Sequence, residues 1–204
     1  MIIWGKRSYG SVKKVGTVSV KTVFGHLYFL PLIPMGSYYV DKKNDAAFEL
    51  NSLNLRSITC GYLRVWGPAV AMLSLLLLQA PDGSGVQLPA AVGLLLGVAG
   101  LLASYIFDKK VNDPQDQLVR NMMQRHFGLA VDPHECATSL QSDITQRMQA
   151  HQGTLLGEHW YREALGDHSL PKPEQELAFL RARCERHDKA LQQTALERLA
   201  QIAA

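Results

Sequence analysis

The residues of this sequence that could hold a metal ion or support hydrolysis lie in its last third. His134, Glu135 and Cys136 are consecutive, and His151 and Glu158 follow. Metal ions need ligands that converge on one point, whereas neighbouring residues of a helix diverge by about 100° around its axis. The HExxH spacing is absent. We expect solvated or capping histidines here, and a hydrolase or metal-dependent site built from His134, Glu135, His151 and Glu158 is the alternative.

No motif for phosphate binding or nucleophilic catalysis accompanies these residues. The chain has no GxSxG element, no Walker motif and no glycine-rich dinucleotide loop. Cys60, Cys136 and Cys184 lie far apart without a CxxC pair, which predicts reduced thiols and argues against a disulfide framework or a cysteine zinc site. The sequence therefore predicts no cofactor and no nucleic-acid partner, and it favours a non-enzymatic role over an enzymatic one.

Charged residues are unevenly distributed along the chain, and this distribution predicts two long apolar helices. Between Val65 and Phe107 the only formally charged residue is Asp82. As helices, residues 63–80 and 86–107 would be about 27 Å and about 33 Å long, which matches the roughly 30 Å of hydrocarbon in a bilayer. The sequence PDGSG at 81–85 suits a tight exposed turn. The pattern predicts a helical hairpin that crosses a membrane; the alternative is two buried helices of a soluble protein.

The charges that flank this hairpin predict its orientation. Residues 1–64 hold nine Lys and Arg against three Asp and Glu, a net charge of +6, and residues 108–204 hold twelve against fourteen. The turn holds no basic residue. Because basic segments stay in the cytoplasm, we expect a multi-pass protein of the bacterial inner (cytoplasmic) membrane with both termini cytoplasmic. Its basic N-terminal part is expected to approach anionic lipid headgroups.

Polar and aromatic residues mark the ends of the two apolar runs. Tyr62, Arg64 and Trp66 would enter the membrane interface at the start of the first helix, and Tyr105 would lie where the second helix leaves it. Pro68 would fall in the first turn of the first helix, where its missing N–H costs nothing. No ionisable residue lies inside either run, so neither a channel nor a transporter is expected.

Small residues recur on one face of each predicted span. They are Gly67, Ala71 and Ser74 in the first run and Gly93, Gly97, Gly100 and Ser104 in the second. Such faces let helix backbones approach closely in a membrane. We expect them to pack the hairpin together, and the alternative is a homo-oligomer formed through Gly93 and Gly97.

Alternating apolar and polar residues predict a small antiparallel β module near the N-terminus. The segment SVKKVGTVSVKTVFG alternates around its valines. Pro31 and Pro34 interrupt the next apolar segment and belong at an edge, a bulge or a bend, because proline cannot donate to a sheet. We expect three or four short strands, with Phe48–Ile58 as a last strand or a short helix.

Part of this module resembles a known family. The segments WGKR and FGHLYFLPLIPMGSYYV resemble small bacterial membrane-associated zinc-ribbon proteins, in which a strand ending FIPxxPxxxxY precedes the second metal knuckle. The resemblance covers residues 1–40, and Phe29-Leu30-Pro31 with Pro34 is its most specific part. No cysteine knuckle lies near Val20 or after Val40, so the metal of that family is not carried over. The resemblance implies a cysteine-less relative whose sheet is held by hydrophobic packing.

The residues after the second span predict a helical domain. Asp113-Pro114 and Asp132-Pro133 each read as the start of a helix, and Gly128 is placed to end the first one. A shorter helix is expected over residues 154–165 and one long helix over residues 174–202. The predicted fold is thus an α+β membrane protein with three parts: a β module at 1–60, a transmembrane hairpin at 61–110 and an α-helical domain at 111–204.

Residue types common at protein interfaces occur in this helical domain. They are Trp160, Tyr161 and Arg162 together with a stripe of leucines, Leu177, Leu180, Leu191 and Leu199. The alternative interpretation of the aromatic residues is the core of the domain. We expect a membrane-anchored, non-enzymatic adaptor or assembly factor that recruits an unknown protein through this domain. A subunit of a larger membrane complex is the second possibility.

Overall fold

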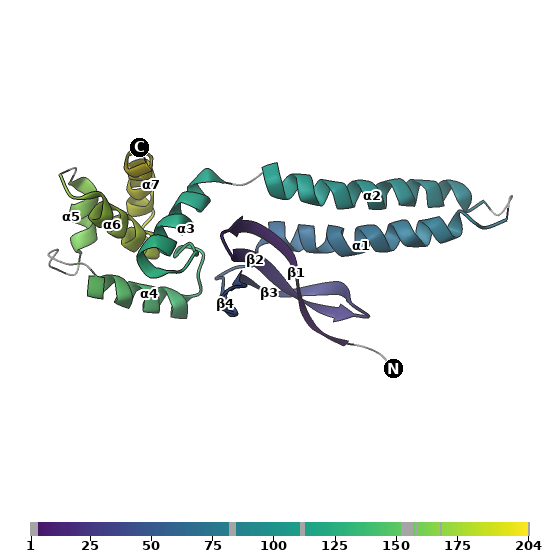
Figure 1. The fold of residues 1–204 in the computed structure, drawn as a ribbon, viewed down its shortest axis with the longest axis horizontal. Coiled ribbons are helices and arrows are strands. Elements are labelled where there is room, and N and C mark those ends of the chain that lie inside the picture. The colour runs from purple at the N-terminus through teal and green to yellow at the C-terminus, as the bar shows by residue number, and fades with distance from the viewer. Residues whose placement is uncertain are drawn as a thin grey trace. The chain divides into compact units, whose positions relative to one another are not determined.

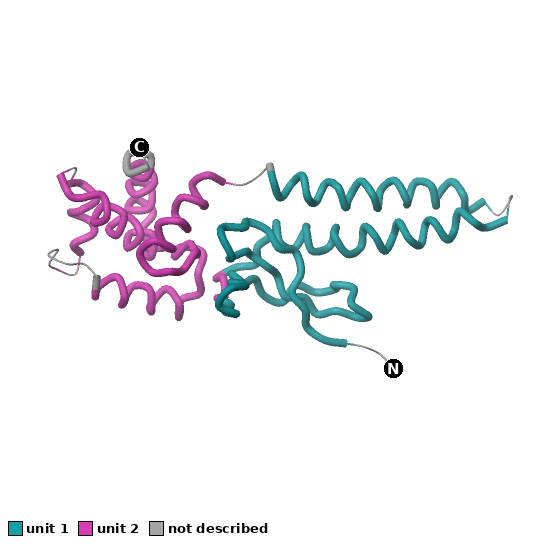
Figure 2. The backbone as a smooth tube through the Cα atoms, in the orientation of Figure 1, with its two compact units in different colours: residues 1–47, 52–112 teal, residues 48–51, 113–204 magenta. Residues whose placement is uncertain are grey.

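The computed structural model of the chain describes residues 4–81, 85–110, 113–151, 157, 159–167 and 169–203. Figure 2 shows that the chain divides into two compact units, the first formed by residues 1–47 and 52–112 and the second by residues 48–51 and 113–204. The β module and the helical hairpin, expected as separate parts, therefore belong to a single unit.

A four-stranded sheet in the order β1-β2-β3-β4 begins the chain (Figure 1). Its strands are β1 (Trp4–Val15), β2 (Val18–Leu27), β3 (Leu30–Asp41) and β4 (Ala46–Glu49). β1 pairs with β2, and β2 with β3, in antiparallel fashion. Val12, Val20 and Phe24 are buried, because alternate residues of a strand point to the same face. The predicted antiparallel sheet is confirmed.

The prolines of β3 lie where its pairing with β2 is irregular. The register shifts between Val23 and Phe24, whose partners are Gly36 and Pro34, and again between Gly25 and His26, where Pro31 is the second partner. Each shift leaves one extra residue in β3, as a β-bulge does. This accommodates the two prolines, which cannot donate hydrogen bonds to a neighbouring strand.

Two long apolar helices follow the sheet in the same unit. They are α1 (Leu55–Leu77) and α2 (Gln87–Lys110), and both are long and apolar enough to cross a membrane. The predicted turn 81–85 lies mostly outside the described residues. α1 begins earlier than expected because the Asn54 side chain caps it, accepting a hydrogen bond from the Ser57 N–H. The expectation that Pro68 lies in the first turn is wrong, since it is inside the helix.

Strand β3 runs antiparallel to the first half of α1. At one end the Asn54 N–H donates to Ser37 Oγ at 2.9 Å, and at the other the Trp66 indole Nε1 donates to the Pro31 carbonyl at 3.0 Å. Between these points Phe24 packs against Gly61, where a Cβ atom would lie 3.1 Å from the phenyl ring. The tip of the β2–β3 hairpin therefore points along α1 toward its C-terminal half (Figure 1).

The second unit contains five helices among its described residues. They are α3 (Pro114–Phe127), α4 (Thr138–His151), α5 (Trp160–Gly166), α6 (Lys172–Cys184) and α7 (Lys189–Ala203). As predicted, Asp113 caps α3 and Gly128 ends it in the left-handed conformation. The Leu50 segment joins this unit through an isolated bridge to Cys136.

Two helix predictions in this unit are wrong. The long helix expected over residues 174–202 is divided, because the Asp188 side chain accepts a hydrogen bond from the Leu191 N–H and starts α7 as an N-cap does. Asp132 does not open a helix either: it accepts from the His134 N–H in a turn, and α4 begins only at Thr138. Residues 154–156 and 158 of the helix expected over residues 154–165 lie outside the described residues.

Candidate functional site

The two apolar helices meet along a seam of small residues spaced by seven. The buried residues of this seam are Cys60, Gly67 and Ser74 on α1 and Ala90, Gly97 and Ser104 on α2. Seven residues are about two helical turns, so each set forms one stripe along its helix. The stripes oppose each other in antiparallel order: the Cys60 thiol donates to the Ser104 carbonyl at 3.6 Å, and Gly67 faces Gly97 in the middle.

Contact at the centre of the seam is close enough to require glycine. A Cβ atom on Gly67 would lie 2.8 Å from the Gly97 carbonyl oxygen, and one on Gly97 would lie 2.6 Å from the Gly67 oxygen. The structure thus brings the predicted small residues together inside the hairpin: a Cβ atom on Gly97 would lie 3.1 Å from the Ala71 Cβ, and one on Gly93 would lie 2.5 Å from Ser74 Oγ. Such backbone approach is how helices associate where apolar burial gives no drive.

The sequence interpretation missed two members of the seam. Cys60 and Ala90 are not among the predicted packing residues, although each lies seven residues from the next member, Gly67 or Gly97. The seven-residue spacing is the signal that would have found them. Gly100, which was predicted, instead faces the end of the Leu63 side chain.

Large apolar side chains cover the outside of this hairpin. Leu95 and Leu96 of α2 are 71% and 67% exposed, and Leu73 and Leu76 of α1 are exposed in the same way. Only 22% and 17% of the residues in the most apolar stretches of α1 and α2 are buried. This is the reverse of a water-soluble helix pair, which buries its leucines and exposes its small and polar residues.

One end of the hairpin holds a cluster of paired charges. Arg64 donates to Asp108 Oδ2 at 3.2 Å and to the Ser11 carbonyl of β1 at 2.7 Å, and its guanidinium lies 4.5 Å from the centre of the Tyr105 ring. Arg56 also pairs with Asp108, at 3.6 Å. A single carboxylate thus pairs with two arginines, and Arg64 joins the sheet, α1 and α2.

Two aromatic residues of α1 use their polar atoms to bind the sheet. The Tyr62 hydroxyl donates to the Leu32 carbonyl at 2.6 Å, and Trp66 donates to the carbonyl of the preceding proline. The sequence predicted both residues at a membrane interface, but their hydrogen bonds to β3 gave no sequence signal. Aromatic residues with a polar end commonly satisfy backbone groups in this way.

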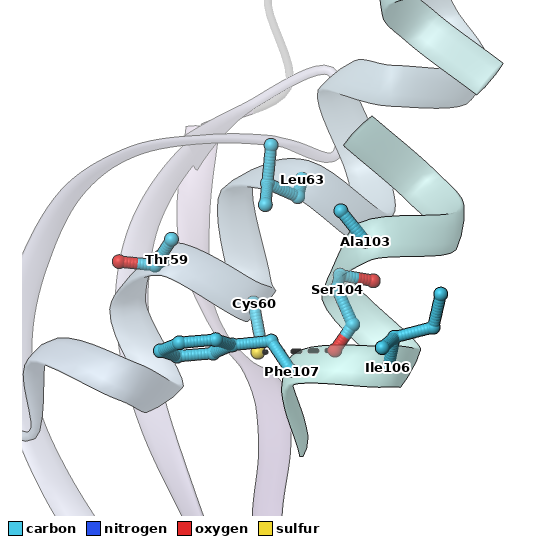
Figure 3. Close-up of a pocket in the computed structure, with 7 residues that line it drawn as sticks. All are labelled: Thr59, Cys60, Leu63, Ala103, Ser104, Ile106 and Phe107. Atoms are coloured by element: carbon cyan, nitrogen blue, oxygen red, sulfur yellow. Dashed lines mark hydrogen bonds between the residues drawn. The ribbon is translucent and has the colours of Figure 1, made fainter. Parts of the chain in front are cut away.

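An apolar pocket of about 470 Å³ opens between α1 and α2 near the charged end (Figure 3). It is lined by Thr59, Cys60, Leu63, Ala103, Ser104, Ile106 and Phe107. The Cys60 thiol is directed at the Ser104 carbonyl, and the hydroxyls of Thr59 and Ser104 donate to backbone carbonyls of their own helices. This lining suits a hydrocarbon chain better than a polar substrate.

The helical unit buries most of the residues predicted to bind a partner. Trp160, Tyr161, Leu177, Leu180, Leu191 and Leu199 are all buried. Arg162 is half-exposed and pairs with Asp188 at 2.8 Å. The burial fits the alternative interpretation of the aromatic residues as a core, and it means that the leucine stripe packs this unit from within.

Two buried carboxylates of this unit are paired with cationic side chains. Glu176 accepts from Arg125 and His126, each at 2.9 Å, and Asp132 accepts from Arg183 at 2.5 Å. Beside Glu176, a pocket of about 310 Å³ is lined by Arg125, His126, Lys172, Pro173 and Glu176. The cationic groups of its lining outnumber the carboxylate.

The candidate metal ligands do not converge where the structure describes them. Cys136 is buried, its thiol donates to the Asp132 carbonyl at 3.1 Å, and burial raises the pKa of the thiol. Burial also lowers the pKa of His134, and the nearby Arg183 lowers it further. The side chain of His151 and all of Glu158 lie outside the described residues. Within the described part of the chain, no three His, Cys, Asp or Glu side chains are grouped to hold a metal ion.

Comparisons with protein-family models, with curated proteins and with solved structures found no match. The function is therefore inferred from the geometry of the hairpin and of the helical unit.

Proposed function

We propose that this protein is a membrane-anchored, non-enzymatic adaptor or assembly factor. In this proposal α1 and α2 cross the inner (cytoplasmic) membrane as a hairpin, both termini lie in the cytoplasm, and the helical unit recruits a protein partner at the membrane surface. The observation that carries the proposal is the inverted burial of the hairpin, with glycine and serine inside and leucine outside.

The physical reason is the solvent that each arrangement suits. Exposed leucines in water cost about 25 cal/mol for every Å² of apolar surface, whereas hydrocarbon removes this cost. A continuous apolar exterior on two helices of this length would drive a soluble protein to aggregate. The paired Arg64 and Asp108 support a position near the membrane boundary, because ionisable groups at that depth are found paired.

Membrane anchorage and orientation are tested together by cysteine labelling in intact spheroplasts. Pro81→Cys places a thiol in the predicted periplasmic turn, and Asn44→Cys places one in the exposed β3–β4 turn. An impermeant maleimide should label Pro81→Cys before lysis and Asn44→Cys only after lysis. Labelling of both sites in intact spheroplasts, or recovery of the chain in the alkaline carbonate supernatant, would refute the anchorage.

Recruitment by the helical unit is supported by its organisation. Leu165, Leu177 and Leu180 are buried in its own core, so it has the packing of an independent folded unit, and its charged pocket near Lys172 is open to solvent. A photo-crosslinking residue in place of Lys172 should capture a partner protein that one in place of the exposed Gln193 does not. A chain that ends at Asn112 should remain in membranes and lose that partner. Retention of the partner by the truncated chain would contradict the proposal.

A second candidate function is membership of a larger membrane complex. Leu88, Leu95 and Leu102 form an exposed stripe with seven-residue spacing on α2, opposite the buried seam. Seven-residue leucine repeats are typical of helix–helix contacts. Gly93 and Gly97 face α1, so this stripe replaces them as the expected contact surface. Disulfide crosslinking of Leu95→Cys into a defined dimer or a specific heteromer in native membranes would favour this candidate; only monomer would reject it.

A further inference from the structure

The sheet of the first unit has one apolar end and one charged end. At the β2–β3 tip the exposed apolar side chains are Trp4, Tyr28, Phe29, Leu32, Ile33 and Met35, with Ile33 60% and Met35 52% exposed. The charged side chains of Lys6 and Arg7 are exposed beside them on β1. At the opposite end Lys14, Lys42, Lys43, Asn44 and Asp45 are exposed. The ten residues of β2 separate the two ends by about 30 Å. A sheet in water on all sides has no physical reason for this polarity.

The apolar side chains of the tip are exposed by specific features of the backbone. The extra residues at the two bulges of β3 are Leu32 and Met35, and bulges are known to redirect side chains. Tyr28 and Phe29 form the two-residue turn between β2 and β3 with positive φ angles of 48° and 68°. This backbone favours glycine or asparagine and is costly for aromatic residues. Strain of this kind marks positions where the side chain itself is used.

The length of α1 places this tip at the depth of the membrane. From Trp66, which is hydrogen-bonded to the tip, to Ala80 at the end of the apolar run is about 21 Å along α1 and the hydrogen-bonded turn that follows Leu77. Because the hydrocarbon core is roughly 30 Å thick, a helix that crosses it needs about twenty residues. Counted back from Ala80, these residues reach Gly61. The stretch that carries Tyr62 and Trp66, and the β-hairpin tip bound to it, therefore lies within the outer part of the hydrocarbon layer or at its edge.

Arginine side chains lie beside the tip, as expected for a surface at the membrane interface. Arg7 stacks over the Phe29 ring at 5.7 Å, where its guanidinium can reach lipid phosphates while its stem stays against apolar groups. Arg64, two residues from both Tyr62 and Trp66, has its charge paired with Asp108. An apolar surface bordered by arginine and aromatic rings is the composition of a membrane-interface anchor.

We propose that the β2–β3 tip is a second membrane-binding element, which enters the headgroup and acyl boundary of the bilayer beside α1. This inference rests on the proposed membrane anchorage and adds to it. The lipid-facing surface is then composite, made of two helices and the end of a sheet. The bilayer is the occupant that the tip fits, because its apolar surface is continuous with the exterior of α1 and lies at the same depth.

The test measures depth at three single-cysteine sites of the full chain in phosphatidylethanolamine–phosphatidylglycerol vesicles. Ile33→Cys reports the tip, Asn44→Cys reports the charged end of the same sheet, and Leu95→Cys reports the middle of α2. Each is labelled with the fluorophore NBD, and the wild-type chain is the labelling blank because its three cysteines are buried. Quenching by doxyl-labelled lipid is compared with quenching by aqueous iodide, and Met35→Cys repeats the tip measurement.

We expect the probe at Ile33→Cys to behave like the probe at Leu95→Cys: doxyl lipid should quench both, and both should be protected from iodide. The probe at Asn44→Cys should be quenched by iodide and not by doxyl lipid. If the tip probes are as open to iodide as the Asn44→Cys probe while the Leu95→Cys probe stays lipid-quenched, tip insertion is refuted and the helical anchor stands. If iodide also quenches the Leu95→Cys probe, the anchorage and the inference that rests on it are both refuted.

Discussion

Leucine has opposite positions in the two units of this protein. In the helical unit Leu180 and Leu199 lie in the core, whereas Leu95 and Leu96 of α2 lie outside and Gly97 lies within. The first arrangement gains stability by removing apolar surface from water, and the second by close backbone contact. The difference teaches that the two units are packed by opposite rules, which supports the proposal that one of them lies in a membrane.

The largest expected effect comes from removing a buried leucine. Leu180→Ala should destabilise the helical unit by about 3 kcal/mol, because it leaves a cavity that the surrounding helices only partly fill. The same change at the exposed position, Leu95→Ala, should alter stability by less than about 0.5 kcal/mol. Hydrogen exchange of the full chain in detergent micelles, resolved by peptide, reports each unit separately. Equal losses of stability from Leu180→Ala and Leu95→Ala would contradict the proposed difference between the units.

The converse substitution should damage the hairpin. Gly97→Ala adds a methyl group 2.6 Å from the Gly67 carbonyl and forces the helices apart, which should cost about 2 kcal/mol. Gly100→Ala is the matched control, because the new methyl group meets only the movable end of Leu63 at 3.3 Å. Both changes improve helix propensity equally. SDS titration of the detergent-solubilised protein, followed by circular dichroism, measures the difference, and a Gly97→Ala variant as stable as the control would contradict the seam.

Removing a carboxylate from an ion pair should have a smaller effect on stability, and this effect should differ between the two units. Asp108→Asn leaves Arg56 and Arg64 without their shared carboxylate, and should destabilise the hairpin by about 1 kcal/mol, since the three side chains are partly exposed. Asp143→Asn removes an ion pair with Arg147 that is about half-exposed, and it should change stability by at most a few tenths of a kcal/mol. The same hydrogen-exchange experiment compares them, and a larger effect for Asp143→Asn would be inconsistent with the paired cluster.

The smallest expected effect concerns the reactivity of a buried cysteine, which tests whether water enters the core of the helical unit. Burial raises the pKa of the Cys184 thiol to about 11. Because only the thiolate reacts, alkylation at pH 8 should be slow and should rise in rate as the pH approaches that value. A cysteine introduced at the exposed Gln193 is the control and should react at an ordinary rate. Mass spectrometry counts the modified thiols. Rapid modification of Cys184 in the folded chain would show that water enters this core.

Local patterns predicted the elements whose cause is local. The two apolar runs, the cap at Asp113 and the end of α3 at Gly128 each depend on a few neighbouring residues, and the structure has them as expected. The division between α6 and α7 was missed, although Asp188 is a residue type that starts helices. The apolar residues along one face of residues 174–202 continue past Asp188, and this pattern favoured a single long helix.

Contacts between distant residues could not be predicted in the same way. The seam pairs Gly67 with Gly97 across a turn, and Tyr62 and Trp66 bind backbone carbonyls of β3 that any sequence would offer. Because every residue has a backbone carbonyl, the attachment of the sheet to α1 could not be predicted from the residue types. The expected separation of sheet and hairpin differs from the structure for this reason.

The two hydrogen bonds from Tyr62 and Trp66 to β3 have a consequence for how the protein responds to lipid composition. A single transmembrane helix adjusts to a thicker or thinner bilayer by tilting or sliding, at a cost of fractions of a kcal/mol for each Å of mismatch. Here α1 cannot slide or rotate about its axis without breaking its bonds to the sheet. In the proposed anchorage α1 moves only together with the sheet, so the bilayer must adapt to this anchor and the protein would be selective for membranes of one thickness.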